Sequence, residues 1–168
     1  MNSSSLCRIA FTCAAALLAS HMLAAGADAQ TVKQAAQTTP AKGSAEAAHK
    51  VAIQVNQNDK AVMDLALNNA KNIIDYYKEK GEKIEIEFVA YGAGLNMMRN
   101  DNSPVKERLT AIAANMKNVT FTGCGNTLAN QSKQEKKEIS LVPEARIVPT
   151  GIGRIVDLEE QGWTYVRP

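Results

Sequence analysis

The chain has 168 residues, with 19 Lys and Arg against 17 Asp and Glu, which gives a formal net charge of +2 at pH 7. This net charge is too small to argue for binding to nucleic acid or to an anionic membrane surface. With two His and three Cys in the whole sequence, a zinc site of the usual ligand types is not expected.

The first 29 residues are typical of an export signal. Arg8 supplies the positive charge, residues 9–19 form a short apolar run, and residues 27–29 form a small-x-small cleavage site. The run is shorter than the roughly 20 apolar residues of a membrane-spanning helix, so we expect cleavage and no stable membrane insertion afterwards. Residues 30–48, rich in Ala, Gln and Thr, are expected to form a disordered linker. Export would place the mature protein in the periplasm or outside the cell.

Residues 49–168 alternate between strand and helix patterns and are expected to form one domain. Alternating apolar residues indicate strands over residues 50–55, 83–91, 119–122, 145–148 and 163–166. Apolar stripes with capping residues indicate helices over residues 60–80, 103–116, from 126 into the polar run that begins at 131, and 151–160. The stripe expected to be buried in the first helix consists of Val62, Leu65, Ala66, Ile73 and Tyr77.

This alternation predicts a three-layer α/β/α fold with a mostly parallel five-stranded sheet between the helices. In the strand at 83–91, Glu85 and Glu87 alternate with apolar residues, which predicts a wet face near the strand's start and a position at the sheet's edge. Ligands of open α/β sheets bind at the carboxyl ends of the strands. The loops expected at that end of the sheet are 56–59, 91–94, 123–127 and 149–151.

Cys124 lies among these loops, between a strand and a helix. It is the one cysteine left after signal removal, because Cys7 and Cys13 belong to the signal. Backbone N–H groups at a helix start have no partners within the helix, and the helix dipole favours negative charge there. We therefore expect the pKa of the Cys124 thiol to lie below the value of about 8.5 of a free cysteine. His49 precedes the first strand at the opposite end of the sheet, so a catalytic Cys–His pair is not expected.

Glycines on both sides of Cys124 suggest that its sulfur is little shielded. Gly123 breaks the strand pattern, Gly125 follows the thiol, and Asn126 and Thr127 are typical of a helix start. A reactive thiol and a small buried side chain at a tight turn both fit this pattern, because unpaired cysteines are often buried. Both interpretations stay open at this point.

Five segments together resemble the exported branch of the DsrE/DsrF-like family, namely residues 51–59, 65–72, 87–95, 124–128 and 161–168. The resemblance implies a three-layer α/β fold, assembly as a homo- or hetero-oligomer, and a relation to sulfur-relay proteins. In the relay members a cysteine after the third strand carries a persulfide to a partner, and Cys124 matches that position by strand count. The residues that follow it, Gly-Asn-Thr-Leu, differ from the alanine and the arginine–glycine pair of the relay members.

The resemblance and the lone thiol favour an exported protein that binds or carries sulfur, as a persulfide, on Cys124 in sulfur trafficking or oxidation. We expect a carrier rather than an enzyme with its own turnover, and no cofactor or metal. Further copies of the chain and a sulfur donor or acceptor protein are the expected partners, with no nucleic acid. The residues expected to line the site are Asn56, Tyr91, Gly123, Gly125, Asn126 and Thr127. Two alternatives stay open: a small-ligand-binding module at the same loops and an assembly subunit, each with a purely structural cysteine.

Overall fold

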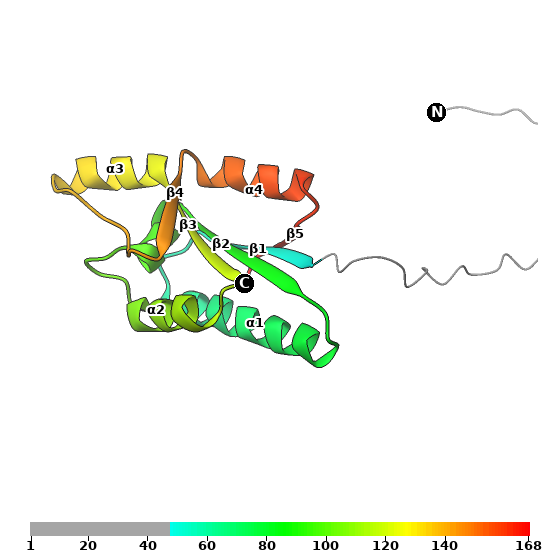
Figure 1. Ribbon diagram of the computed structural model, residues 1–168. Helices are drawn as coiled ribbons and strands as arrows, with labels where there is room; N and C mark the ends of the chain where they lie inside the picture. Colours follow the sequence, from blue (N-terminus) through cyan, green and yellow to red (C-terminus); the bar gives the residue numbers. More distant parts are fainter. Residues whose placement is uncertain (1–47) are drawn as a thin grey trace, which may run out of the picture. The chain divides into compact units, whose positions relative to one another are not determined.

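The structure is a computed structural model that describes residues 48–168. The expected signal at 1–29 and nearly all of the expected linker at 30–48 lie outside the described residues. Five strands form one sheet in the order β4-β3-β2-β1-β5, and every neighbouring pair is parallel (Figure 1). The predicted α/β fold is confirmed, with an entirely parallel sheet. Its strands are β1 (His49–Val55), β2 (Ile84–Ala90), β3 (Val119–Cys124), β4 (Ala145–Val148) and β5 (Thr164–Val166).

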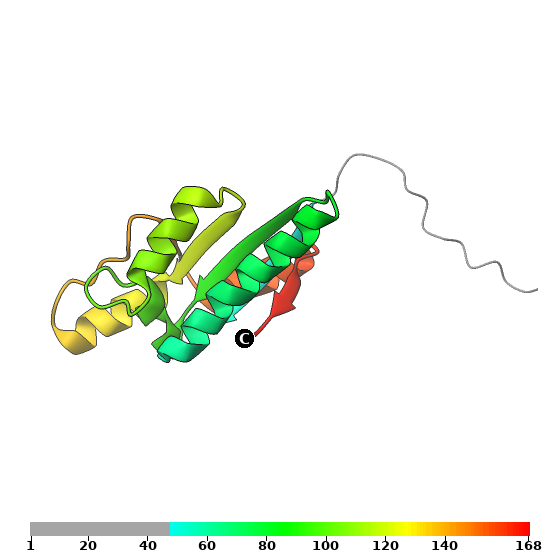
Figure 2. The same ribbon diagram turned by 90° about the horizontal axis from the view of Figure 1, so that it is seen from below.

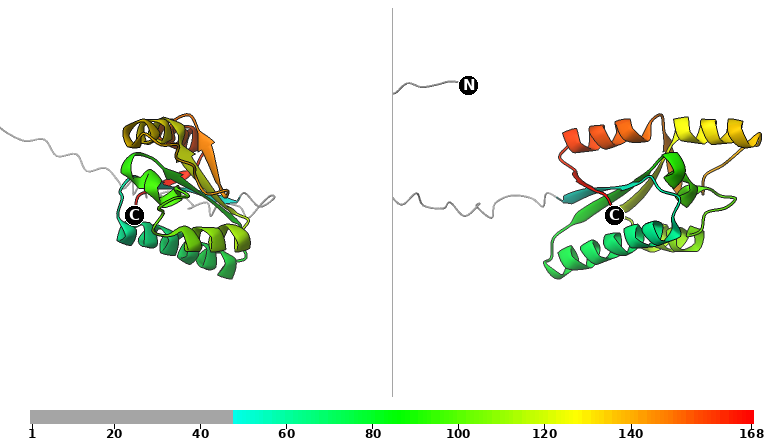
Figure 3. Two further views of the ribbon diagram at one scale, coloured as in Figure 1. Left: turned by 90° about the vertical axis from the view of Figure 1, so that its left-hand side faces the viewer. Right: turned by 180° about the vertical axis from the view of Figure 1, so that it is seen from behind.

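Helices cover both faces of this sheet. On one face lie α1 (Lys60–Glu79) and α2 (Lys106–Asn115), and on the other lie α3 (Gly125–Glu135) and α4 (Gly151–Glu160) (Figure 1, Figure 2). A 3-10 helix, η1 (Gly92–Met98), follows β2. Views from the side and from behind show the sheet as the middle of three layers (Figure 3). No helix within residues 48–168 is both long enough and apolar enough to cross a membrane.

The ends of the long helices follow local signals in the sequence. The Asp59 side chain accepts a hydrogen bond of 2.7 Å from the backbone amide of Ala61 and so caps α1 at its start. Gly81 after α1 (φ +70°) and Gly162 after α4 (φ +82°) adopt the left-handed conformation, which favours glycine. These residues end the helices where the sequence predicts.

The larger apolar core lies between the sheet and the layer of α1 and α2. The rings of Phe88 on β2 and Phe121 on β3 stack within it, with centroids 5.0 Å apart. On α1, Met63 and Leu67 are fully buried, whereas Leu65, expected in the buried stripe, is 47% exposed. Each residue turns the helix by about 100°, so a stripe through positions 63 and 67 leaves position 65 on the opposite side.

The other face combines a small apolar core with a buried charge. Glu87, on β2, is 1% exposed and accepts hydrogen bonds from Arg146 on β4 and Arg154 on α4. The expected edge position of this strand is wrong, because β2 is the middle strand of the sheet. The prediction that Glu87 is exposed is also wrong. Its carboxylate can be buried because the two arginines neutralise its charge. Glu85, nearer the strand's start, is exposed as expected. The apolar core beside this charge consists of Ala52, Val89, Ile155 and Leu158.

Helix α3 contributes no residue to either apolar core. Its far end is held by the buried Arg99, whose guanidinium donates to Glu135 on α3 (2.5 and 2.9 Å) and to Asp101 (2.7 and 2.9 Å). Closer to the middle of the helix, the Gln131 side chain donates to the Gly92 carbonyl oxygen at 3.2 Å. Polar contacts, rather than apolar burial, therefore fix α3 against η1 and the segment that follows it.

The ion pairs at the end of α3 predict a specific loss of stability in acid. Hydrogen bonds from Arg99 and from Lys137 lower the pKa of the Glu135 carboxyl to about 2. Their stabilisation is present above the unfolded-state pKa of about 4.3 and is lost as the pH falls towards the folded-state value. Urea unfolding of Glu135→Gln should therefore show a deficit in the free energy of unfolding at about pH 6 that shrinks by about pH 2.5.

Glu138→Gln is the matched control, because Glu138 is exposed and takes no part in the ion pairs around Arg99. This control should match the wild type at both pH values. An equal deficit of Glu135→Gln at both pH values would contradict the prediction.

Candidate functional site

The carboxyl ends of β2, β3 and β4 bring the predicted loops into contact. The Gly92 backbone amide donates to the Thr127 hydroxyl oxygen at 3.1 Å, which joins the loop after β2 to α3. The Asn126 amide donates to the Pro149 carbonyl oxygen at 3.1 Å, which joins α3 to the loop after β4. The expected meeting of these loops at one end of the sheet is confirmed.

Cys124 ends β3 and caps the start of α3. Its Sγ accepts a hydrogen bond of 3.4 Å from the backbone amide of Thr127. The start of α4 lies beside it, since a Cβ added at Gly151 would lie 3.2 Å from the Cys124 Cβ. The first turns of two helices therefore meet at one sulfur atom, where their unpaired N–H groups and their dipoles favour a negative charge.

Burial and hydrogen bonding act on the Cys124 thiol in opposite directions. Burial raises its pKa, whereas hydrogen bonds from the Thr127 side chain and from the backbone amides of Thr127, Gly151 and Asn126 lower it. The hydrogen bonds together outweigh burial, so the pKa lies below its ordinary value. The Thr127 hydroxyl suits this role, because its oxygen accepts the Gly92 amide while its proton stays free for the sulfur.

The sulfur is covered, contrary to the expectation from its glycine neighbours. Cys124 is 5% exposed. A Cβ added at Gly125 would lie 3.1 Å from the Val148 carbonyl oxygen, and one added at Gly151 would lie 2.9 Å from the Tyr91 Cβ. The glycines thus let neighbouring segments approach closely, and those segments close over the thiol instead of leaving it open.

Two of the predicted lining residues lie away from the sulfur. Gly123 faces the α2 side of the sheet, because strand residues alternate between faces and a Cβ there would lie 3.1 Å from the Leu95 Cδ1. Asn56 lies against η1, where a Cβ added at Gly94 would come within 2.7 Å of the Asn56 Cα. Gly123 therefore serves packing on the other face of the sheet, and Asn56 borders the loops beside Gly94.

Four predicted residues do surround the thiol, and the structure adds a fifth. The predicted four are Tyr91, Gly125, Asn126 and Thr127. Gly151 was expected only as part of a neighbouring loop, yet it lies against Cys124, where a Cβ added at Gly151 would be 3.2 Å from the Cys124 Cβ, and its amide helps to lower the thiol pKa. The Tyr91 hydroxyl accepts from the Gln54 side chain, which in turn accepts from Tyr165 on β5. This chain of hydrogen bonds ties Tyr91 to the far edge of the sheet.

A buried charge network on the same face as Cys124 was missed by the sequence analysis. Thr122, two residues before Cys124 on β3, donates to Glu87 Oε1 at 2.8 Å. Burial raises the pKa of Glu87, but hydrogen bonds from Arg154, Arg146 and Thr122 outweigh burial and keep the carboxylate charged. The two-residue period of strands is the signal that could have put Thr122 and Cys124 on one face.

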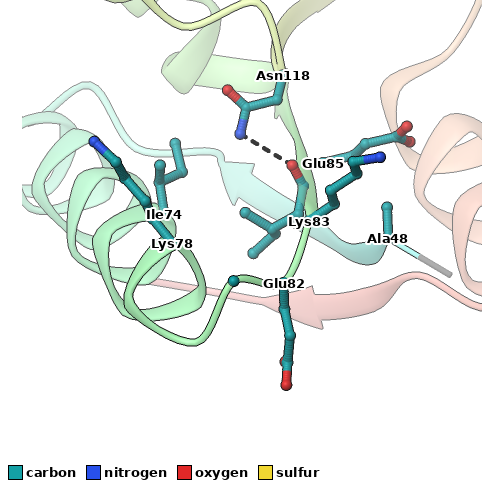
Figure 4. A pocket seen from close by; sticks show the side chains of 9 residues that line it. Ala48, Ile74, Lys78, Glu82, Lys83, Glu85 and Asn118 are labelled. Atoms are coloured by element: carbon teal, nitrogen blue, oxygen red, sulfur yellow. Dashed lines mark hydrogen bonds between the residues drawn. The ribbon is translucent and has the colours of Figure 1, made fainter. Parts of the chain in front are cut away.

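A separate hollow of about 460 Å³ lies at the opposite, amino end of the sheet (Figure 4). Its lining carries side chains of both charges, namely Lys78, Lys83, Glu82 and Glu85. In its wall, Asn118 Nδ2 donates to the Ile84 carbonyl oxygen at 2.9 Å. Neither Cys124 nor any residue that bonds its sulfur lines this hollow. Within residues 48–168, no group of three or more His, Cys, Asp or Glu side chains is arranged to hold a metal ion.

Comparison with known proteins supports the fold and assigns no activity. No protein-family model matches the chain, and no curated protein sequence matches it significantly. The solved structure of a protein of unknown function from Methanobacterium thermoautotrophicum is similar, with a TM-score of 0.61 and 27% sequence identity. The similarity covers 71% of this chain and 99% of that protein. The DsrE/DsrF-like resemblance therefore stays a prediction.

The close approach at Gly151 predicts that a single methyl group will disturb the thiol. In Gly151→Ala the new Cβ meets the Cβ atoms of Tyr91 and Cys124, neither of which can swing away. We expect a loss of about 1–3 kcal/mol in the free energy of unfolding. We also expect a higher thiol pKa, because the Gly151 amide is pushed from the sulfur. Urea unfolding and the pH dependence of Cys124 alkylation measure the two effects.

Gly153→Ala on the same helix is the control. Its Cβ would meet only the Thr150 side chain, which can rotate, and alanine favours a helix by up to about 1 kcal/mol. It should leave the thiol pKa unchanged. A Gly151→Ala variant as stable as Gly153→Ala, with the thiol pKa of the wild type, would show that the close approach does not exist.

Proposed function

We propose that the protein is an exported sulfur carrier of the DsrE/DsrF-like type, which holds a persulfide on Cys124. The observation that carries this proposal is one unpaired thiol whose sulfur receives N–H groups from the starts of α3 and α4. The thiolate is the form of cysteine that attacks sulfur, and these N–H groups favour it. The resemblance of the five sequence segments to the DsrE/DsrF-like family suggests that the group carried is sulfur.

The transfer needs no oxidant or reductant beyond the donor itself. The Cys124 thiolate attacks the outer sulfur of a donor persulfide, a new S–S bond forms on Cys124, and the donor's S–S bond breaks. The electron pair of the broken bond stays on the donor, which leaves as a thiolate and takes up a proton from water. An acceptor thiolate then attacks the outer sulfur on Cys124 and reverses the exchange.

A single thiol limits the chemistry to this kind of exchange. Within the part of the chain that the structure describes, Cys124 is the one cysteine. The other two, Cys7 and Cys13, fall in the expected signal. A dithiol–disulfide cycle needs a second thiol to resolve the intermediate. The domain therefore suits a carrier that accepts and releases one sulfur atom.

Burial of the thiol means that a covering element must move before transfer. Helix α3 is the element best suited to move. None of its residues belongs to either apolar core, so a shift of α3 exposes no core side chain of its own. Its contacts to Gly92 and Arg99 are hydrogen bonds and ion pairs, which water can replace. We propose that access to Cys124 follows from displacement of the first turn of α3.

We propose that the protein assembles as a homo-oligomer. The alternative to the carrier function is a purely structural role for Cys124. Ile152 and Val156, one turn apart on α4, are 57% and 49% exposed, and further copies of the chain would cover them. The alternative, a ligand-binding or assembly module with an inert cysteine, is favoured by the low exposure of Cys124. Loading of sulfur onto the thiol separates the two functions.

The carrier proposal predicts a persulfide on one peptide of the protein. After incubation with inorganic polysulfide, the peptide that contains Cys124 should gain about 32 Da, the mass of one sulfur atom, and lose it on treatment with dithiothreitol. Mass spectrometry of the digested protein locates the adduct. Cys124→Ser, which keeps the size of the side chain, should show no gain on that peptide. An unmodified wild-type peptide would refute the carrier role and leave the structural one.

A further inference from the structure

The loop between β4 and α4 places Gly151 beside Cys124. One arginine precedes this loop and another follows it, each at the same separation in the sequence. Arg146 lies three residues before Pro149, and Arg154 lies three residues after Gly151. The loop's own side chains belong to neither apolar core. The loop is held over Cys124 by the hydrogen bond from the Asn126 amide to the Pro149 carbonyl oxygen and by the elements at its two ends, β4 and α4.

Both arginines meet at one buried carboxylate. Arg146 Nη2 donates to Glu87 Oε2 at 2.6 Å. Arg154 donates from Nε to Oε1 at 2.9 Å and from Nη2 to Oε2 at 2.8 Å, which makes a two-point contact. Thr122 completes the group, since its hydroxyl donates to Glu87 Oε1 at 2.8 Å and accepts from Arg146 Nε at 2.9 Å. Glu87 itself lies on the middle strand, which gives the group a rigid base.

We propose that Glu87 is a positioning residue that clamps both ends of the 149–151 loop and so holds the Gly151 amide against the Cys124 sulfur. The clamp grips β4 through Arg146 and the first turn of α4 through Arg154. Its value for the protein rests on the proposed function, because only a reactive thiol needs a fixed amide beside it. Glu87 touches neither the sulfur nor its cargo and acts through the loop.

The charge of Glu87 and its clamping role affect the thiol with opposite signs. A negative carboxylate on the same face of the sheet disfavours the thiolate, so its charge alone raises the thiol pKa. The clamp lowers that pKa by holding an N–H group at the sulfur. The other charged groups around Glu87 are Arg146 and Arg154, and Asp157 acts on Arg154 from the same helix.

Glu87→Gln separates the two effects, because it removes the charge and keeps the shape. The readout is the pH midpoint of iodoacetamide alkylation, followed on the peptide that contains Cys124. Loss of the clamp should raise this midpoint and lower the thiolate fraction at about pH 7 by roughly three- to tenfold. Each rate is divided by its plateau at high pH, so that easier access of the reagent to the sulfur does not enter the comparison. A lower midpoint, as charge removal alone would cause, or an unchanged one, would overturn the proposal.

Arg154→Lys decides the matter if Glu87→Gln does not fold. Lysine keeps the positive charge but cannot make the two-point contact with Glu87, so the clamp loosens without a change in net charge. The midpoint should again rise, whereas a charge effect alone predicts no change. Arg108→Lys is the control, because Arg108 pairs with Asp64 and Asn68 in the other helix layer. The alkylation midpoint tests the clamp, whereas sulfur loading tests the carrier role. Because the midpoint does not depend on loading, failure of one proposal can be distinguished from failure of the other.

Discussion

The site depends on the convergence of two helix starts on one sulfur atom. An all-parallel sheet puts the carboxyl ends of β3 and β4 side by side, and each strand is followed directly by a helix on the same face. The N–H groups of α3 and α4 that find no partner within their helices therefore point to a shared place, and Cys124 occupies it. Topology thus supplies the backbone donors, and the Thr127 side chain adds the largest single contribution that lowers the thiol pKa.

The same arrangement explains why the thiol is acidic and covered at once. Hydrogen bonds lower a pKa only when donors come close, and donors that come close exclude water. Gly125 and Gly151 permit that approach, since a side chain at either would meet neighbouring atoms. Chemistry at Cys124 then requires motion, and the element that we propose to move is α3, which is held by polar contacts.

Much of the fold could be predicted from the sequence, because strand alternation, the Asp59 cap and the glycines at 81 and 162 are local signals. Glu87 was misjudged because its partners, Arg146 and Arg154, lie 59 and 67 residues further along the chain. The position of Cys124 between a strand and a helix could likewise be predicted from the residues around it in the sequence. The burial of its side chain could not. Besides the first turn of α3, the atoms around the thiol come from Tyr91 and the 149–151 loop, which no local pattern relates to Cys124.

The pH dependence of Cys124 alkylation in the native protein, measured against the same chain unfolded in urea, tests the central claim most directly. In the unfolded chain the midpoint should lie near the free-thiol value of about 8.5. In the native protein it should lie clearly lower, because the amides of α3 and α4 hold the thiolate. A native midpoint equal to or above the unfolded one would mean that burial outweighs those amides, and a role in sulfur transfer would lose its physical basis.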